Sequence, residues 1–422
     1  MAASTLPPLP TQARPARSWI ALLGIASGLS AFGMASVVPS LPLLADTFRT
    51  DYAQLQWVVS AYLLGLGLAQ PVQGWLCDRF GRRPVLLIGF AAFAAASLLA
   101  SMATSLSALV IARFAQALGV SVATVASRAM VRDRHDADSA AAALAFITAV
   151  MGLAPVLAPL AGGVVVDLFN WRALFIMHFV MAVVLLIWMV VSLVETRPAN
   201  TRVLGVRSTF RAFGVLLQDR SFTTHTLVYC FMSAASFAFI TCGAELFSRL
   251  FQMSPAAFGV FWAVLAGAYT IGASIAGFVT RRFGARRVLI QGTALSLVGG
   301  SLFAWLAWSE TISLAGYTAA LIMLTMGNGV TSPLALAGAV NDHPEMAGTA
   351  SGLSSAMAML VSMCFAIGTG YAFDGTAISV GWILALGTLL SWLAAIASSS
   401  HRPTTTQAMH EESERASNDT RP

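Results

Sequence analysis

Apolar runs long enough to cross a bilayer core, about 20 residues each, recur along the whole chain and are separated by short polar segments. Gly and Pro occur inside many of these runs, and membrane helices tolerate both because neighbouring helices satisfy the freed backbone groups. The pattern predicts an all-α integral membrane protein with twelve transmembrane helices. The predicted spans are residues 18–44, 55–77, 84–103, 107–130, 139–166, 172–194, 222–248, 256–280, 286–308, 311–337, 347–373 and 377–398.

A short charged motif occurs twice, each time at a predicted exit from the membrane. The first copy begins at Gly74 and reads GWLCDRFGRR, and the second begins at Gly277 and reads GFVTRRFGARR. The two copies start 203 residues apart in a chain of 422 residues, which is nearly half its length. This spacing indicates a duplicated membrane half, and many secondary transporters place the substrate site between such halves. We therefore expect two pseudo-symmetric six-helix bundles.

The longest polar break between predicted spans contains Pro198 and five Arg residues, and it separates six spans from six. Residues 1–17 are rich in Pro, Ala and Thr, and residues 400–422 are polar; both compositions are typical of disordered tails. The predicted organisation is a tail at 1–17, an N-terminal bundle at 18–194, a linker at 195–221, a C-terminal bundle at 222–398 and a tail at 399–422.

The composition fits a membrane protein and assigns an orientation. The chain is 57% hydrophobic and 10% charged, whereas soluble domains carry about 25% charged residues. All 24 basic residues are Arg; 20 of them fall on the side that holds both termini, three on the other side, and Arg113 lies within a span. Basic residues concentrate on the cytoplasmic side, so we expect both termini in the cytoplasm of a bacterial cell, with the chain in its inner membrane. The net charge of +6 is then a topology signal and does not indicate nucleic-acid binding.

The residue pattern does not suggest catalysis or a cofactor. The four Cys residues lie in or at the ends of spans without paired spacing, which argues against a disulfide framework or a metal site. The sequence contains no phosphate-binding Gly loop with Lys and no convincing Ser-His-Asp set. We therefore expect a protein that is not an enzyme and needs no cofactor.

The first copy of the repeated motif resembles the loop between the second and third helices of the major facilitator superfamily, roughly G-x-L-x-D-R-x-G-R-R. The matching residues are Gly74, Leu76, Asp78, Arg79, Gly81, Arg82 and Arg83. The resemblance implies a cytoplasmic latch that breaks and reforms during transport. Gly81 permits the tight turn that this short loop needs, and Asp78 can accept hydrogen bonds from Arg or from a helix N-terminus. Arg82 and Arg83 could instead be topology anchors alone, and the second copy, with Arg281 in place of the acid, is expected to anchor more than to switch.

Arg113 is a charged residue inside the fourth predicted span, where a charge is costly unless it faces a polar interior. Its surroundings resemble the R-x-x-Q-G-x-G motif of the same superfamily: Arg113, Gln116 and Gly119 match, and Ala117 replaces the first Gly. The resemblance implies a role in proton coupling or substrate contact. The alternative is that Arg113 snorkels toward the outer surface.

The fifth span contains small residues at four-residue spacing, which let two helices approach closely. It resembles the antiporter signature of the superfamily, G-x-x-x-G-P-x-x-G-G, through Ala154, Pro155, Ala158, Pro159, Gly162 and Gly163. The signature implies export, whereas a generic packing seam is the alternative.

Further segments resemble the bicyclomycin-resistance (Bcr/CflA) branch of drug/proton antiporters, among them Gly67 to Pro71, Arg128 to Asp133, Asn170 to Arg172 and Glu195-Thr196. Many members of that branch carry an Asp in the first span, and here the corresponding residue is Ala35. An expected proton carrier is therefore missing. Glu245 is the remaining acid within a central span; it is either a proton- or cation-binding carboxylate or a solvated acid at the outer mouth.

By family analogy, the substrate site lies near the membrane midplane between the halves. The candidate lining residues, each of which could instead be a packing residue, are Met34, Tyr62, Gln70, Tyr229, Phe237, Tyr269 and Asn328. Few fixed charges there would suit neutral or amphipathic ligands. The predicted function is export of small drugs or xenobiotics by proton antiport, carried out by a monomer. A metabolite exporter, a proton-coupled importer and a non-transporting sensor are the alternatives.

Overall fold

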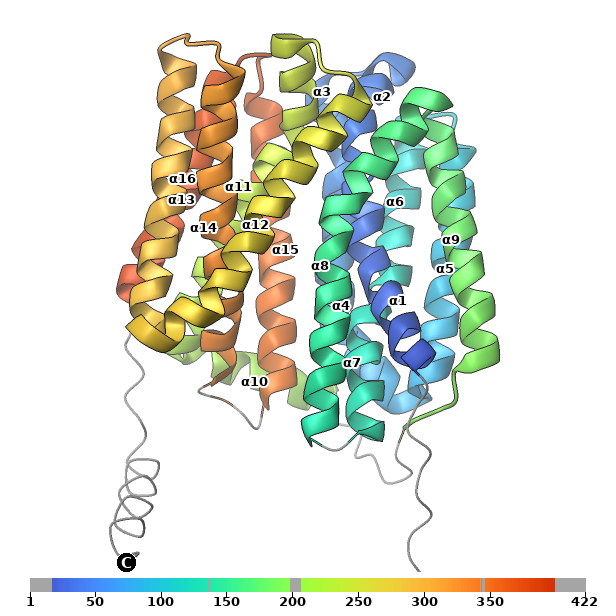
Figure 1. Cartoon of the computed structure of the whole chain (residues 1–422). Coiled ribbons are helices and arrows are strands. Elements are labelled where there is room, and N and C mark those ends of the chain that lie inside the picture. Colours follow the sequence, from blue (N-terminus) through green and yellow to red (C-terminus); the bar gives the residue numbers. More distant parts are fainter. Residues whose placement is uncertain (1–16, 136, 198–205, 342, 344–345, 399–422) are drawn as a thin grey trace, which may run out of the picture.

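The computed structural model describes residues 17–135, 137–197, 206–341, 343 and 346–398. The regular structure in these ranges is helical, and twelve helical segments there are long and apolar enough to cross a membrane, as predicted. The segments run side by side, and both ends of the described chain lie at one face, the bottom of Figure 1. We call this the terminal face and the other end of the helices the opposite face.

The N-terminal half comprises the first six spans, several of which are interrupted. Its elements are α1 (Arg17–Ala35), η1 (Val38–Ser40), α2 (Leu41–Phe48), α3 (Tyr52–Leu55), α4 (Trp57–Phe80), α5 (Arg82–Ser101), α6 (Leu106–Val120), α7 (Val122–Arg134), α8 (Ala137–Leu168) and α9 (Trp171–Ser192).

Prolines explain why the first span is built from three short helices. Pro39 and Pro42 each stand in the first turn of a helix, η1 and α2 respectively. Proline lacks an N–H, which the first turn of a helix does not need. The chain therefore begins a new helix at each proline and stays helical to Phe48, four residues beyond the predicted end of this span.

The C-terminal half has longer, less interrupted helices. Its elements are α11 (Arg220–Phe251), α12 (Pro255–Phe283), α13 (Ala285–Trp308), α14 (Leu314–Asn341), α15 (Ala347–Ala372) and α16 (Ala377–Ala397), preceded by α10 (Val206–Gln218) in the connection between the halves.

Helix α10 lies within the segment that the sequence analysis treated only as a linker. Leu216 of this helix is fully buried and packs with Phe222 of α11, Ala339 of α14, and Ala350 and Leu353 of α15. The connection between the halves is thus attached to the C-terminal half at the terminal face, where Figure 1 places α10.

The two copies of the charged motif form equivalent turns. Gly81 and Gly284 have φ values of 100° and 83°, a conformation that favours glycine, and each is the single residue between two long helices. Arg83 donates to the carbonyl of Val190 near the end of α9 at 3.0 Å. Arg286 donates to the carbonyls of Ser398 and Ile396 at the end of α16, at 3.0 and 3.2 Å. In both halves an arginine after the turn therefore holds the C-terminus of the last helix, an end that favours positive charge.

Candidate translocation site

The halves are in closest contact near the opposite face, where α8 meets α12. A Cβ atom on Gly163 would lie 2.4 Å from the carbonyl oxygen of Pro255, and one on Gly259 would lie 2.5 Å from that of Pro159. Both distances are far below ordinary contact, so each position needs glycine. The C-terminal part of the antiporter-like segment thus forms a close helix–helix contact between the halves.

The rest of the antiporter-like segment faces the N-terminal half itself. A Cβ atom on Gly162 would lie 2.0 Å from the carbonyl oxygen of Ser36. Ala154 and Ala158 are buried, and Ala154 lies against Gly28 of α1. The side chain of Pro155 is outside the described residues. One seam of small residues therefore packs α8 against α1 on one side and α12 on the other.

Polar contacts close the opposite face between α3, α4 and α11. The hydroxyl of Tyr52 donates to the carbonyl of Thr241. The amide of Gln56 donates to the same carbonyl at 3.4 Å and lies 3.9 Å from the Cys242 sulfur. Asp167 at the end of α8 accepts from the N–H of Ala256 at 3.0 Å. These bonds join the halves across the boundary that would have to open on this side.

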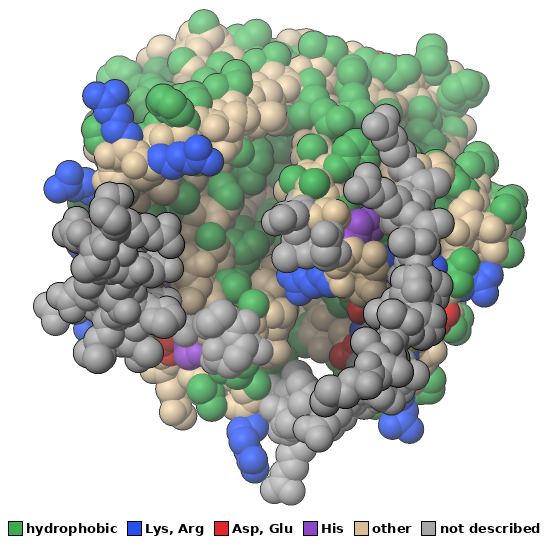
Figure 2. All heavy atoms as spheres, turned by 60° about the horizontal axis from the view of Figure 1, so that its bottom comes forward, with side chains coloured by type: hydrophobic (Ala, Val, Ile, Leu, Met, Phe, Trp, Pro, Cys, Tyr) green, Lys and Arg blue, Asp and Glu red, His purple; other side chains and the backbone are tan. Residues whose placement is uncertain are grey.

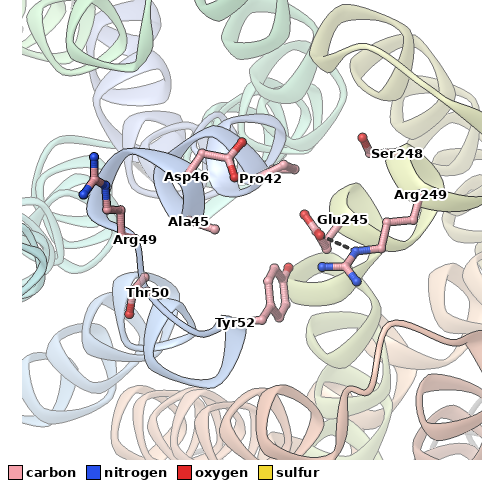
Figure 3. Close-up of a pocket in the computed structure, with 9 residues that line it drawn as sticks. All are labelled: Pro42, Ala45, Asp46, Arg49, Thr50, Tyr52, Glu245, Ser248 and Arg249. Atoms are coloured by element: carbon pink, nitrogen blue, oxygen red, sulfur yellow. Dashed lines mark hydrogen bonds and ion pairs between the residues drawn. The ribbon is translucent and has the colours of Figure 1, made fainter.

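A cavity of about 450 Å³ lies above this closure at the opposite face. Figure 3 shows its lining, in which α2 and the segment after it approach the end of α11. Glu245 is 9% exposed, and its carboxylate pairs with the Arg249 guanidinium at 2.5 Å. Asp46 and Arg49 complete a lining with two acids and two cations. Glu245 is thus a paired acid at the mouth of this cavity.

The terminal face is open by comparison. Figure 2 shows that the surface recedes near the middle of this face. In the part of the chain that the structure describes, the hydrogen bonds joining the halves all lie toward the opposite face. The molecule is therefore closed on one side and hollowed on the other.

Three of the predicted substrate residues come together in the C-terminal half. Asn328 of α14 donates to the Ser236 hydroxyl of α11 at 2.7 Å and accepts from the Ser332 hydroxyl at 2.5 Å. Tyr269 of α12 also interacts with Ser332, and Tyr229 of α11 lies close enough to interact electrostatically with Tyr269. The remaining C-terminal candidate, Phe237, is half-buried on α11.

The N-terminal candidates are placed differently. Tyr62 is fully buried and donates to the carbonyl of Ser30 at 2.9 Å, and Met34 is 5% exposed. Gln70 is half-buried on α4. Tyr62 and Met34 are therefore core residues in this conformation, and a substrate could reach them only after the N-terminal half rearranges.

Arg113 lies entirely inside the N-terminal half. Its guanidinium donates to the carbonyls of Val58 at 3.3 Å and Gly33 at 2.9 Å, and to the Gln116 side chain at 2.9 Å. It also lies over the Tyr62 ring, 4.1 Å from the ring centroid. The residue is 0% exposed, so the snorkelling alternative is wrong. Arg113 instead ties α1, α4 and α6 together.

The latch residues form an ion-pair cluster at the terminal face. Arg82 is 5% exposed and pairs with Asp78 at 3.1 Å and with Asp133 at the end of α7 at 3.0 Å. Arg79 is exposed, and its carbonyl accepts from Arg197 at 2.8 Å. A Cβ atom added at Gly74 would meet only Val125, and one added at Gly81 would meet Glu195 and Pro84, all of the N-terminal half. In this conformation the described latch contacts are therefore internal to one half.

Glu195 caps the helix that follows the latch turn. Its carboxylate accepts from the backbone N–H groups of Arg82 and Arg83 at the start of α5, at 3.0 and 3.1 Å. It also accepts from those of Thr196 and Arg197, both at 2.9 Å. Partial burial alone would raise the pKa of Glu195, but these backbone hydrogen bonds favour the charged form and bring the pKa below its ordinary value.

Sequence reasoning missed the structural roles of Asp133 and Glu195. Both stand in segments that contributed to the family resemblance, but no partner was assigned to them. A signal was available, because each is an acid at a span end on the side that holds the basic loop motif.

Two six-helix halves with a hollow between them define a membrane transporter that works on small molecules. The chain matches the Major Facilitator Superfamily over residues 23–367, and it belongs to that family. Relatives include multidrug resistance protein D of Escherichia coli (strain K12), 28% identical over 75% of this chain and 79% of that protein. The bicyclomycin resistance protein homolog of Haemophilus influenzae is 27% identical over 83% of this chain and 86% of that protein.

Solved structures support the same fold. A bacterial homolog of the human lysosomal transporter Spinster, in an inward-facing conformation, superimposes with a TM-score of 0.71 at 15% identity. That match covers 92% of this chain and 95% of the other. The nucleoside transporter NupG gives a TM-score of 0.73 at 14% identity, over 90% of this chain and all of the other. The predicted drug-efflux resemblance and the twelve-helix fold are confirmed.

Proposed function

We propose that this protein exports small organic compounds from the side of its terminal face to the side of its opposite face, by alternating access. The observation that carries the proposal is the combination of a hollow at the terminal face with tight closure at the opposite face. An alternating-access transporter exchanges its cargo with the side of the terminal face in this arrangement, and the outward direction is proposed from the relatives. Relatives named for multidrug and bicyclomycin resistance support a drug-like substrate.

The terminal face is proposed to be cytoplasmic. The side predicted to hold the termini receives 20 of the 24 Arg residues, and basic residues near span ends remain on the cytoplasmic side. The membrane would be the bacterial cytoplasmic (inner) membrane. Because one chain supplies both halves of the site, the proposal requires only a monomer.

The latch is proposed to change partners during transport. While the terminal face is open, Arg82 pairs with Asp78 and Asp133, and the backbone N–H groups of Arg82 and Arg83 donate to Glu195, all within one half. Closure of that face would bring the C-terminal half to the same loop, near Gly74, and give Asp78 a new partner.

Proton antiport is proposed to use Glu245, because Ala35 has no titratable group. Glu245 is largely buried beside the cavity of the opposite face and pairs with Arg249 one turn further along the same helix, so a proton that enters this cavity from outside reaches the pair directly. A proton arriving from outside would neutralise the carboxylate and release the arginine. Arg113 would then act as a positioning residue that keeps α1, α4 and α6 together rather than as the proton carrier.

The test uses everted membrane vesicles with an acid interior, reported by a pH-sensitive dye, and a panel of drugs and metabolites. The expected result is that a transported compound dissipates the gradient in vesicles with the protein and not in empty ones. Glu245→Gln should abolish dissipation but not binding, whereas the matched change Asp46→Asn, at an exposed acid of the same cavity, should leave it intact. Transport of the compound without any effect on the gradient would overturn proton coupling. Export from the cell corresponds to uptake into everted vesicles, so a protein that takes up no compound of the panel would overturn export.

A further inference from the structure

Helix α7 is packed on three sides, and its fourth side faces the C-terminal half. Ser127 donates to the carbonyl of Leu23 in α1 at 3.2 Å. Val122 lies against Gly89 of α5, and Val125 lies against Gly74 of α4. Thr124 and Arg128 are one helical turn apart and lie on the side of α7 that these three contacts leave free. Both are half-buried.

Arg128 faces a group of polar residues in the opposite half. Arg128 and Tyr229 of α11 lie within electrostatic range of each other, and so do Tyr229 and Tyr269 of α12. Tyr269 is 36% exposed and adjoins the network of Ser332 and Asn328. Arg128 lies six residues before the end of α7, about 9 Å inside the terminal-face end of this helix. A ligand entering from the terminal face would therefore meet this cation.

The charge of Arg128 has no acidic counterpart in the described part of the chain. Among the residues whose side chains the structure describes, the acids near the terminal face are engaged elsewhere: Asp78 and Asp133 pair with Arg82, Glu195 caps α5, and Asp219 pairs with His343. A half-buried arginine between membrane helices is costly when unpaired, because little water compensates its charge. An anionic ligand would supply the missing partner.

Resting on the proposed export function, we infer that Arg128, with Tyr229 and Tyr269, forms a binding site for amphipathic aromatic anions such as carboxylates and sulfonates. The guanidinium offers a planar set of donors suited to two acidic oxygens. The two tyrosines offer ring faces and hydroxyl groups for an aromatic body. This refines the expectation of a cavity suited to neutral or amphipathic ligands.

An anionic substrate also fits the absence of an acid at Ala35. The membrane potential is negative inside, so it favours outward movement of an anion. Such a ligand would be exported even where proton coupling is weak.

The test measures binding calorimetrically with the purified full chain and three ligands of one shape: 2-naphthoate, 2-naphthylmethanol and protonated 2-naphthylmethylamine. Naphthoate should bind at least about tenfold more tightly than the alcohol, and the amine most weakly, as expected for one charge-assisted interaction. Arg128→Gln should remove the tenfold advantage and leave the affinity for the alcohol unchanged. Arg132→Gln, four residues further on at an exposed position of the same helix, removes the same charge and should leave the preference intact.

Equal affinities of the unaltered protein for naphthoate and the alcohol would overturn the site, and this comparison needs no variant. Equal weakening of naphthoate binding by Arg128→Gln and Arg132→Gln would also overturn it, because it would indicate general electrostatics. The vesicle assay is read separately. Selective naphthoate binding with no transport of any compound would leave the site standing and refute export. Transport of neutral compounds by a protein that does not prefer naphthoate would support export and refute the anion site.

Discussion

At the scale of single residues, Arg113 illustrates how a buried charge can serve structure. Arg113→Lys keeps the charge but cannot reach the carbonyls of Gly33 and Val58 and the Gln116 side chain in one planar arrangement. We expect it to lower the free energy of unfolding by about 2 kcal/mol, the usual cost of losing hydrogen bonds to a charged group. The measurement is the unfolding temperature of the detergent-purified protein.

The matched control for Arg113→Lys is Arg172→Lys. Arg172 also lies over an aromatic ring, 4.3 Å from the centroid of Trp171, but it is exposed. Exposed substitutions usually change stability by less than about 0.5 kcal/mol. Equal effects of the two changes would contradict the structural role assigned to Arg113.

Glu195 gives a pH-dependent prediction, because backbone hydrogen bonds hold its pKa below the ordinary value. Its stabilising contribution is complete above the unfolded pKa of about 4.3, and it is lost as the pH falls through the lower, folded value. Glu195→Gln should therefore cost about 1 kcal/mol at neutral pH, the size of a charge at an exposed helix N-terminus. The difference in unfolding temperature from the unaltered protein should disappear in strongly acidic buffer.

Glu310→Gln is the control for this titration. Glu310 is exposed near the opposite face, and its carboxylate makes no hydrogen bond within the described residues. The variant should unfold like the parent at every pH. A Glu195→Gln difference that stays constant down to strong acid would show that the carboxylate charge is not what stabilises α5.

At the scale of helices, the contact of α8 with α12 is expected to control which face is closed. Gly163→Ala would place a methyl group 2.4 Å from the Pro255 carbonyl oxygen, a backbone atom that cannot move aside cheaply. Overpacking of this kind costs about 1–3 kcal/mol. The cost applies only while α8 and α12 are in contact, so opening of the opposite face relieves it. The population of the opened state should rise about fivefold or more.

The readout is alkylation of Phe237→Cys by a membrane-impermeant maleimide added at the opposite face. Phe237 is half-buried on α11, one helical turn from Thr241 on the terminal-face side of the bonds that join the halves. The exposed Cys364 is first replaced by Ser; the other three cysteines are buried. Gly152→Ala is the matched control, since a Cβ at Gly152 on the same helix meets nothing within 4 Å. If both variants react at the parental rate, the seam does not govern closure.

Helices were easier to predict than the contacts between them. The length of each apolar run reflects the thickness of the bilayer, so the twelve spans followed from composition alone. Helix α10 was missed because its apolar side is short and depends on the ends of α11, α14 and α15 for burial. The backbone partners of Arg113 come from α1 and α4, and the α5 partners of Glu195 are Arg82 and Arg83; each of them is more than 50 residues away in the sequence. The position of Glu195 at a span end beside a basic motif indicated that it could have a partner, but a single sequence does not identify which residue the partner is.

At the scale of the whole molecule, the two halves are fastened unequally at the two faces. The opposite face is joined by close glycine contacts and by hydrogen bonds to Thr241 and Asp167. At the terminal face, Arg82, Asp133 and Glu195 bond within one half. Alternating access then requires that the inter-half bonds near Tyr52 and Gln56 break, while the closing of the terminal face supplies new contacts to the latch.

Preventing that opening should therefore stop transport. Gln56, the residue that precedes α4, lies beside the native Cys242 of α11, with its amide nitrogen 3.9 Å from the sulfur, so Gln56→Cys creates a thiol pair across the halves. A short bis-methanethiosulfonate reagent should bridge the pair and abolish transport of any compound that the vesicle assay identifies. A reductant should cleave the bridge and restore transport. Gln56→Cys with Cys242→Ser should be insensitive to the reagent. Full transport after quantitative bridging would mean that this boundary stays closed throughout the cycle, and that substrates cross the opposite face by another route.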